Sequence, residues 1–230
     1  MPSTRKALTL AILAAFLCAT AVSAAKAPRV LFLLPKVQYM YLPHWMIGDE
    51  LFPVVDELEA HGVVVEFTSP QAAVYPIPVD EAEQVIREVA VETPSDEIDL
   101  SRYEIVAIAG GHVHQYLTVL VEPNASLLHE AYARGMTLAG MSQGALVLND
   151  SGLLSGRTIA RCPWGHGIVY CHNSIPAFEK AGTRISRSEC LVVSNEIPGE
   201  STIITATHDC KIAFAHAILE DLGLLDPDAE

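Results

Sequence analysis

From residue 29 onward, short runs of β-forming apolar residues alternate with segments whose apolar residues repeat at helical spacing. Residues 30–34 form a continuous apolar run, which suits a strand covered on both faces, and residues 63–67 form a second strand. The segment between them predicts a helix with Asp49 near its cap, Pro53 in or near its first turn and Gly62 at its end. Together these three segments predict a β-α-β unit.

The alternation continues to the end of the chain. Further predicted strands are residues 105–109, 137–141, 191–193 and 202–206, and further helices are residues 143–149 and 211–222. The strands at 191–193 and 202–206 flank a turn signal and predict a hairpin. The acidic segment 80–102 predicts a solvated helix and loop. This order indicates an α/β fold with an open, mostly parallel sheet and helices on both faces.

The first 25 residues have the three parts of a secretory signal peptide: Arg5 and Lys6, an apolar stretch, and small residues up to Ala25. An uncleaved membrane anchor would need about 20 strongly apolar residues, and this stretch is rich in Ala, Thr and Ser. We therefore expect residues 1–25 to be removed and residues 26–230 to form one secreted or periplasmic domain. No later segment has the length and apolar character of a membrane span.

The chain is acidic, with 14 Lys and Arg against 28 Asp and Glu and a net charge of −14. Recognition of nucleic-acid phosphates needs clustered basic side chains, and the sequence has no such cluster. We therefore expect no nucleic-acid partner. A small-molecule or peptide substrate fits this composition better.

Removal of residues 1–25 takes away Cys18 and leaves four cysteines, which are Cys162, Cys171, Cys190 and Cys210. In an oxidising compartment an even number predicts two disulfides, and the sequence leaves their three connectivities open. Four buried free thiols are the alternative. Neither CxxC nor HExxH spacing occurs, so we expect no metal site and no cofactor.

The five residues from Gly140 to Gly144 read G-M-S-Q-G and stand between a predicted strand and a predicted helix. G-x-S-x-G in this position is typical of a nucleophile elbow, because the glycines relieve crowding in a sharp turn that exposes the serine hydroxyl. Ser142 is therefore the candidate nucleophile. The alternative is a glycine-rich turn without chemistry.

Gly110 and Gly111 end another predicted strand. Ligands of a parallel sheet gather at the carboxyl ends of its strands, so this turn and Ser142 are expected to share one crevice. The backbone N–H groups of Gly111 and Gln143 are then candidate oxyanion donors. An ordinary strand-to-helix turn is the alternative interpretation of the two glycines.

These features resemble the ThiJ/PfpI family within the class I glutamine amidotransferase-like superfamily. The resemblance covers residues 29–224 and includes Asp49-Glu50-Leu51-Phe52-Pro53, residues 151–158 after the elbow, and residues 203–223. It implies a flavodoxin-like three-layer α/β sandwich that often forms a homodimer. It also implies a reactive Cys at the elbow, an acidic residue of the first helix beside it and an oxyanion hole at the Gly-Gly turn.

The chain departs from this pattern at the elbow, where Ser142 stands in place of Cys and Gln143 in place of the histidine found in several branches. Lowering the pKa of a thiol is enough to activate it, whereas a serine hydroxyl needs a general base. Similarity to the glutamine amidotransferases implies His208, which follows the last strand and precedes Asp209, as that base.

Other ionisable residues complete the candidate site. Asp49 matches the acidic residue of the family's first helix, with its neighbour Glu50 as the second candidate, and either could orient a histidine or a substrate amine. His112, on the Gly-Gly turn, is the reserve base. Structural roles are expected for His114, His166 and His172.

The sequence thus predicts a serine hydrolase that acts on an amide or related C–N bond. A ThiJ/PfpI-like protein that has lost catalysis and acts as a binding or chaperone-like protein is the first alternative, favoured by the loss of Cys. An esterase of the α/β-hydrolase type is the second, and it is suggested by G-x-S-x-G alone.

Overall fold

A computed structural model describes residues 26–36, 45–79, 85–111, 122–161, 178–195 and 197–226. Several sequence-based predictions lie outside these residues. They are the signal peptide and the roles of Cys18, His112, His114, Cys162, His166, Cys171 and His172.

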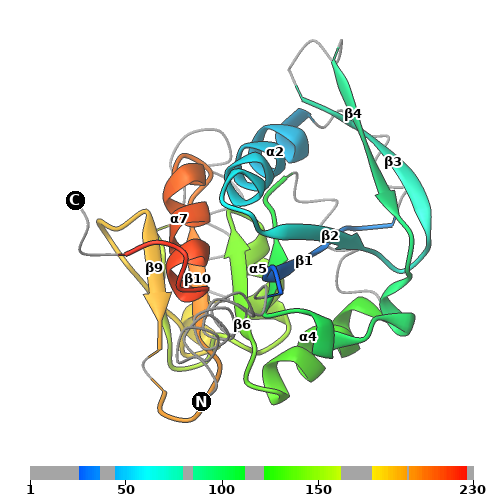
Figure 1. The fold of residues 1–230 in the computed structure, drawn as a ribbon. Coiled ribbons are helices and arrows are strands. Elements are labelled where there is room, and N and C mark those ends of the chain that lie inside the picture. The colour runs from blue at the N-terminus through cyan, green and yellow to red at the C-terminus, as the bar shows by residue number, and fades with distance from the viewer. Residues whose placement is uncertain are drawn as a thin grey trace, which may run out of the picture.

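The centre of the molecule is a six-stranded sheet with the strand order β2-β1-β5-β6-β10-β9 (Figure 1). Its strands are β1 (Arg29–Leu33), β2 (Val64–Thr68), β5 (Ile105–Ile108), β6 (Thr137–Met141), β9 (Leu191–Ser194) and β10 (Ile203–Ala206). The strands from β2 to β10 are parallel, and β9 pairs antiparallel with β10. The predicted strands, the β-α-β unit and the C-terminal hairpin are therefore confirmed.

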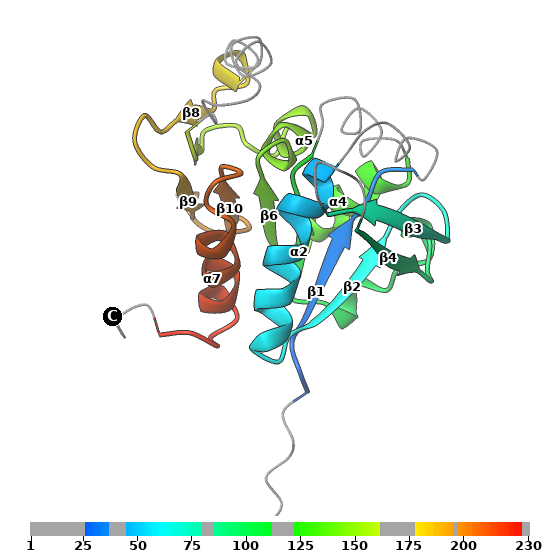
Figure 2. The same ribbon diagram turned by 90° about the horizontal axis from the view of Figure 1, so that it is seen from above.

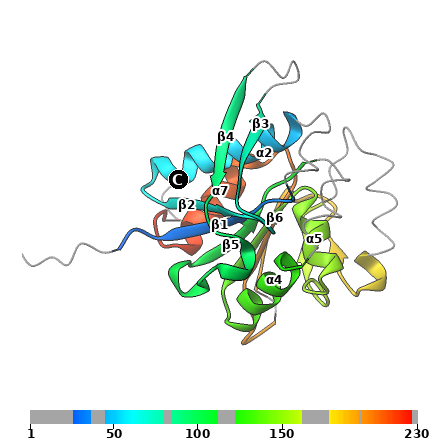
Figure 3. The same ribbon diagram turned by 90° about the vertical axis from the view of Figure 1, so that its right-hand side faces the viewer.

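Helices cover both faces of this sheet, as Figures 2 and 3 show. One face packs against α2 (Trp45–Ala60) and α7 (Lys211–Asp221), and the other against α4 (Asn124–Ala133) and α5 (Gly144–Asp150). The side chains of β1 alternate between the two cores, because Phe32 packs with the α2 and α7 layer and Leu31 with the α4 and α5 layer. The protein is a three-layer α/β sandwich, as predicted.

A two-stranded antiparallel ribbon, β3 (Ala73–Pro78) with β4 (Ile86–Val91), stands beside the sheet (Figure 3). Two short 3-10 turns follow it, η2 (Ser95–Glu97) and η3 (Leu100–Arg102). The prediction of a solvated helix and loop in segment 80–102 was therefore wrong for its described residues. The reason is that β4 is half-buried, with Val89 and Val91 packed in the core while the alternate residues Ile86, Glu88 and Ala90 are exposed.

Pro53 lies inside α2, eight residues after the helix begins at Trp45. The prediction that placed Pro53 in or near the first turn and Asp49 near the cap was therefore wrong. Proline has no backbone N–H, so the carbonyl of Asp49 receives no helical hydrogen bond from residue 53. The helix ends as predicted, with Gly62 at a φ of +80°.

The C-terminal hairpin is tied to its surroundings by a buried arginine. Arg157 is 0% exposed, and its guanidinium donates to the carbonyl of Ser194 at 3.0 Å and to that of Ser201 at 2.8 Å. It also pairs with Glu200 at 3.2 Å. These bonds hold both strands of the hairpin next to the short parallel pair β7 (Thr158–Ile159) and β8 (Arg184–Ile185).

Candidate active site

Ser142 lies in the turn between the carboxyl end of β6 and the start of α5. Its φ is +53°, a left-handed conformation that side chains disfavour, and its N–H donates to the carbonyl of Ala206 at 2.7 Å. A Cβ at Gly144 would lie 2.5 Å from the carbonyl oxygen of Ile108, so only glycine fits there. This strained turn between a strand and a helix has the geometry of a nucleophile elbow.

Glu50 of α2 points into the same corner and is only 2% exposed. The Ser142 side chain lies beside its carboxyl group, because Ser142 Cβ and Glu50 Oε2 lie 2.8 and 1.2 Å from the same point, the position of a Cβ on Gly110. The second carboxyl oxygen, Oε2, is buried without a hydrogen-bond partner. This oxygen lies 1.2 Å from the position that a Cβ of residue 110 would occupy, so Gly110 provides the space for the carboxyl group.

Burial raises the pKa of Glu50 from 4.5 to about 8. The hydrogen bond from Ser142 and the positive charge of Lys211 lower this pKa, and the negative charge of Asp49 raises it, but burial is the largest effect. Glu50 is therefore mostly a neutral acid at pH 7 and becomes a carboxylate in mildly alkaline solution.

The two predicted oxyanion donors flank this pair. Gly111 is buried with a φ of +145°, immediately after the Gly110 that accommodates Glu50. Gln143 follows Ser142 in the elbow, and no described residue accepts a hydrogen bond from its backbone N–H. The Oε1 atom of the Gln143 side chain is likewise buried without a partner. Polar groups at the elbow thus remain available for a ligand.

Asp49 forms its ion pair with α7. Its Oδ2 lies 2.5 Å from Nζ of Lys211, and both side chains are partly exposed. Of the two acidic candidates of the first helix, the structure therefore brings Glu50, and not Asp49, into contact with Ser142.

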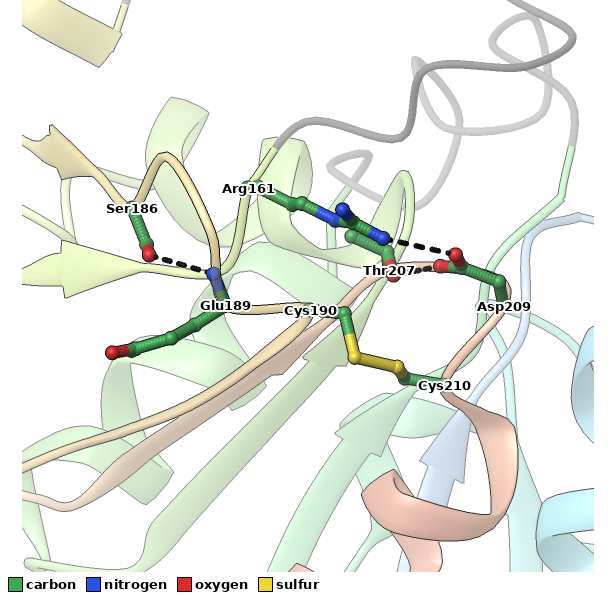
Figure 4. The surroundings of a disulfide bond; sticks show 7 residues. All are labelled: Arg161, Ser186, Glu189, Cys190, Thr207, Asp209 and Cys210. Carbon is green, nitrogen blue, oxygen red and sulfur yellow. Dashed lines mark hydrogen bonds and ion pairs between the residues drawn. A yellow bond between two sulfur atoms is a disulfide. The ribbon is translucent and has the colours of Figure 1, made fainter.

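His208 lies in the turn between β10 and α7 and is half-buried. No hydrogen bond within the described part of the chain joins its imidazole to Ser142 or to any other residue. Asp209 accepts a hydrogen bond from the Thr207 hydroxyl, which lowers the pKa of Asp209, and it pairs with Arg161 at 3.2 Å (Figure 4). These contacts hold the turn, and they do not link His208 to the elbow.

A disulfide joins Cys190, just before β9, to Cys210, which caps α7 (Figure 4). The carbonyl of Cys190 also accepts a hydrogen bond from the N–H of Thr207 at 2.8 Å. Of the three connectivities left open by the sequence, this pairing is the one that links the third and fourth of the four cysteines. The first residue after the disulfide-bonded Cys210 is Lys211.

Sequence reasoning missed Lys211, although a signal was present. It is the only Lys or Arg after Arg187, and it occupies the first position of a helix. A cation at a helix N-terminus is unfavourable next to the helix dipole, so such a residue is expected to have an acidic partner elsewhere. That partner is Asp49.

Two further findings concern the described residues as a whole. They contain no group of three or more His, Cys, Asp or Glu side chains arranged to hold a metal ion. Within the same ranges, no helix combines the length and hydropathy that crossing a membrane requires.

Solved structures of ThiJ/PfpI and DJ-1 proteins share this fold. A ThiJ/PfpI domain protein of Brachyspira murdochii matches with a TM-score of 0.64 at 16% identity, covering 88% of this chain and 100% of that one. A DJ-1 superfamily protein of Agrobacterium tumefaciens matches with a TM-score of 0.62 at 19% identity over 88% and 93% of the two chains. Drosophila melanogaster DJ-1beta matches with a TM-score of 0.62 at 16% identity over 87% and 92%.

The sequence itself matches no family model and no curated protein. At these identities the likeness shows the fold, which is the flavodoxin-like sandwich of the ThiJ/PfpI and DJ-1 proteins. The resemblance seen in the sequence is therefore confirmed at the level of the fold.

Proposed function

We propose that the protein is a hydrolase in which Ser142 is the nucleophile and Glu50 is the general base, acting on an amide or related C–N bond of a small molecule or peptide. The observation that carries this proposal is the position of the Ser142 side chain beside a carboxyl group that is 2% exposed, where the two side chains approach the same point above Gly110. Glu50 thereby takes the role that the sequence suggested for His208.

The basicity of Glu50 supports this role. An ordinary glutamate, with a pKa near 4.3, is too weak a base to remove the proton of a serine hydroxyl efficiently. Burial raises the pKa of Glu50 to about 8, which is as basic as an imidazole or more so. A serine hydroxyl needs a general base, which a thiol does not, and the Glu50 carboxylate can supply that base to Ser142.

The reaction proceeds in two halves. Ser142 Oγ attacks the carbonyl carbon while its proton passes to the Glu50 carboxylate, and the N–H groups of Gly111 and Gln143 stabilise the oxyanion. As the C–N bond breaks, the protonated Glu50 gives its proton to the leaving amine, which leaves an acyl group on Ser142. A water molecule then attacks this ester and gives a proton to Glu50, and Glu50 passes that proton to Ser142 Oγ as the acyl C–O bond breaks and the carboxylic acid is released.

A fluorophosphonate probe tests this proposal, because it phosphonylates activated serines. We expect labelling of the folded protein at pH 8–9, located on Ser142 by peptide mass spectrometry. Ser142→Ala should abolish it and Glu50→Gln should reduce it by about 100-fold or more. Ser151→Ala is the matched control, since Ser151 is a nearby serine whose hydroxyl binds the Val147 carbonyl at 2.8 Å.

The alternatives predict other results. Absence of labelling at every pH, in protein shown by circular dichroism to be folded, would contradict hydrolysis and favour a binding or chaperone-like protein. The α/β-hydrolase esterase receives no support from the fold, which matches the ThiJ/PfpI and DJ-1 structures instead.

A further inference from the structure

Lys211 connects three parts of the molecule that meet near the elbow. Its Nζ lies 2.5 Å from Oδ2 of Asp49 on α2, and its backbone directly follows Cys210, which is bonded to Cys190 next to β9. Asp49 is the neighbour of Glu50 in the sequence. The disulfide, Lys211, Asp49 and Glu50 are therefore connected in series, by bonds along the chain and by the ion pair between Lys211 and Asp49. This series ends at Glu50, the base of the proposed reaction.

The part of α2 that Lys211 contacts lacks one of the helix's own bonds. Pro53 has no N–H to donate to the carbonyl of Asp49, so the helix is held less firmly at this turn than elsewhere. The ion pair between Lys211 of α7 and the side chain of the same residue gives this turn a second attachment. Gly48, one residue earlier, packs so closely on Pro78 that a Cβ there would lie 2.0 Å from the Pro78 carbonyl oxygen.

The charges that act on Glu50 come from both helices. Asp49 on α2 is negative and Lys211 on α7 is positive, while the elbow contributes the neutral hydroxyl of Ser142. Neither Gly110 nor Gly111, in the turn after β5, carries a charge. His208, in the turn before α7, makes no hydrogen bond or ion pair with Glu50 among the described residues.

We propose that Lys211 is a positioning residue for the Glu50–Ser142 pair. Anchored to β9 through the Cys190–Cys210 disulfide, it fixes the turn of α2 that carries Glu50 and neutralises Asp49 beside it. This inference rests on the proposed function, because it assigns Lys211 an effect on the base of that reaction. Lys211 itself does not touch the reacting atoms.

Two substitutions that remove opposite charges test this role. In Lys211→Met the negative charge of Asp49 is no longer neutralised, so Glu50 should ionise at a higher pH. In Asp49→Asn the positive charge of Lys211 is no longer neutralised, so Glu50 should ionise at a lower pH. The measured quantity is the midpoint of the pH profile of Ser142 labelling, and we expect shifts of about one pH unit in opposite directions. Lys211→Arg, which keeps the charge, should restore the original midpoint.

Arg134→Met is the matched control, since Arg134 forms an ion pair of the same length, 2.5 Å, with Glu130 on α4. It should leave the midpoint unchanged. If Lys211 only supported the fold, Lys211→Met and Asp49→Asn would both lose labelling, and the midpoint of the pH profile would stay unchanged or move in the same direction in both variants. An unchanged midpoint, or midpoints that move in the same direction, would overturn the inference.

The disulfide is tested separately. Mild reduction of the folded protein, or Cys190→Ala with Cys210→Ala, should move the midpoint in the direction seen for Lys211→Met. An unchanged midpoint in reduced, folded protein would show that the disulfide does not hold Lys211.

A second readout separates this inference from the proposed function. The pH above which the stability difference between the protein and its Glu50→Gln variant stops changing reports ionisation of folded Glu50 without any reaction. If no serine is labelled at any pH, the proposed function fails, yet this upper limit of the pH dependence still tests Lys211. If labelling occurs and neither the labelling midpoint nor this upper limit responds to Lys211→Met, only the role of Lys211 fails.

Discussion

The carboxyl group of Glu50 occupies the space that a side chain at residue 110 would need. Its Oε2 lies 1.2 Å, and Ser142 Cβ 2.8 Å, from the position of a Cβ on Gly110. Gly110 and Glu50 come from different layers of the sandwich, since one follows β5 in the sheet and the other lies on α2. The glycine therefore determines whether the acid can reach the serine.

Gly110→Ala is expected to displace Glu50 from Ser142, because the new methyl group and the carboxyl oxygen cannot occupy the same space. We expect loss of Ser142 labelling and a fall of about 2–3 kcal/mol in the free energy of unfolding, measured by urea denaturation. Gly62→Ala serves as control: it has open space but a φ of +80°, so it should cost about 1 kcal/mol and keep labelling. Full labelling of Gly110→Ala would contradict this account of Glu50.

The stability of the protein should fall as the pH rises between about 4.5 and 8. In this window the pKa of Glu50, raised to about 8 by burial, keeps the folded state protonated, whereas the unfolded state ionises near 4.5. The folded state thus binds more protons, so the unfolding free energy decreases with pH, by roughly 4–5 kcal/mol in total from this residue. Glu50→Gln should remove this contribution, and urea denaturation at pH 5 and pH 8 measures it. Equal pH dependence of the two proteins would show that Glu50 is not protonated.

The pH profile of Ser142 labelling should identify the base. With a pKa of about 8 for Glu50, only about a tenth of the protein is reactive at pH 7, so labelling should rise about tenfold between pH 7 and pH 9. A histidine base would instead give a midpoint near 6.5. His208→Ala is accordingly expected to leave the profile unchanged. A midpoint near 6.5 that disappears in His208→Ala would restore the histidine as base.

Loss of the buried Arg157 should destabilise the C-terminal hairpin. Arg157→Met leaves the carbonyls of Ser194 and Ser201 without their donors at 3.0 and 2.8 Å, and we expect a cost of about 3 kcal/mol or more by thermal or urea unfolding. The exposed pair Arg134–Glu130 provides the comparison, and Arg134→Ala should cost about 0.5 kcal/mol or less. Similar costs for the two variants would mean that burial of Arg157 contributes little.

The inner strands of the central sheet, β1, β5, β6 and β10, were predictable because each is a largely apolar run that is buried on both faces. Residues 137–141 were predicted as a strand and form β6, Thr137–Met141, in which every residue is buried. The ribbon of β3 and β4 was missed because only alternate residues of β4 are buried, and because Pro76 and Pro78 within β3 obscure the pattern. A half-exposed ribbon with prolines resembles a loop until its partner is known.

The turn that carries Ser142, the proposed nucleophile, was predictable from local sequence, whereas the acid that lies beside it was not. The choice between Asp49 and Glu50 did have a local signal, because Glu50, Val54 and Leu58 follow one another at four-residue intervals and form one buried stripe of α2. Asp49 lies about 100° away from that stripe and is partly exposed. The role of Glu50 further depends on the contact with Ser142, which is 92 positions away in the sequence and follows from the tertiary structure alone.

The left-handed backbone conformation of Ser142 opposes stability to the proposed activity at this residue. A glycine would adopt a φ of +53° at little cost, whereas serine is disfavoured there by about 1 kcal/mol. Glycine would therefore relieve the backbone strain of this turn but would remove the hydroxyl group beside the buried Glu50. A substitution chosen only to relax this backbone would inactivate the proposed site.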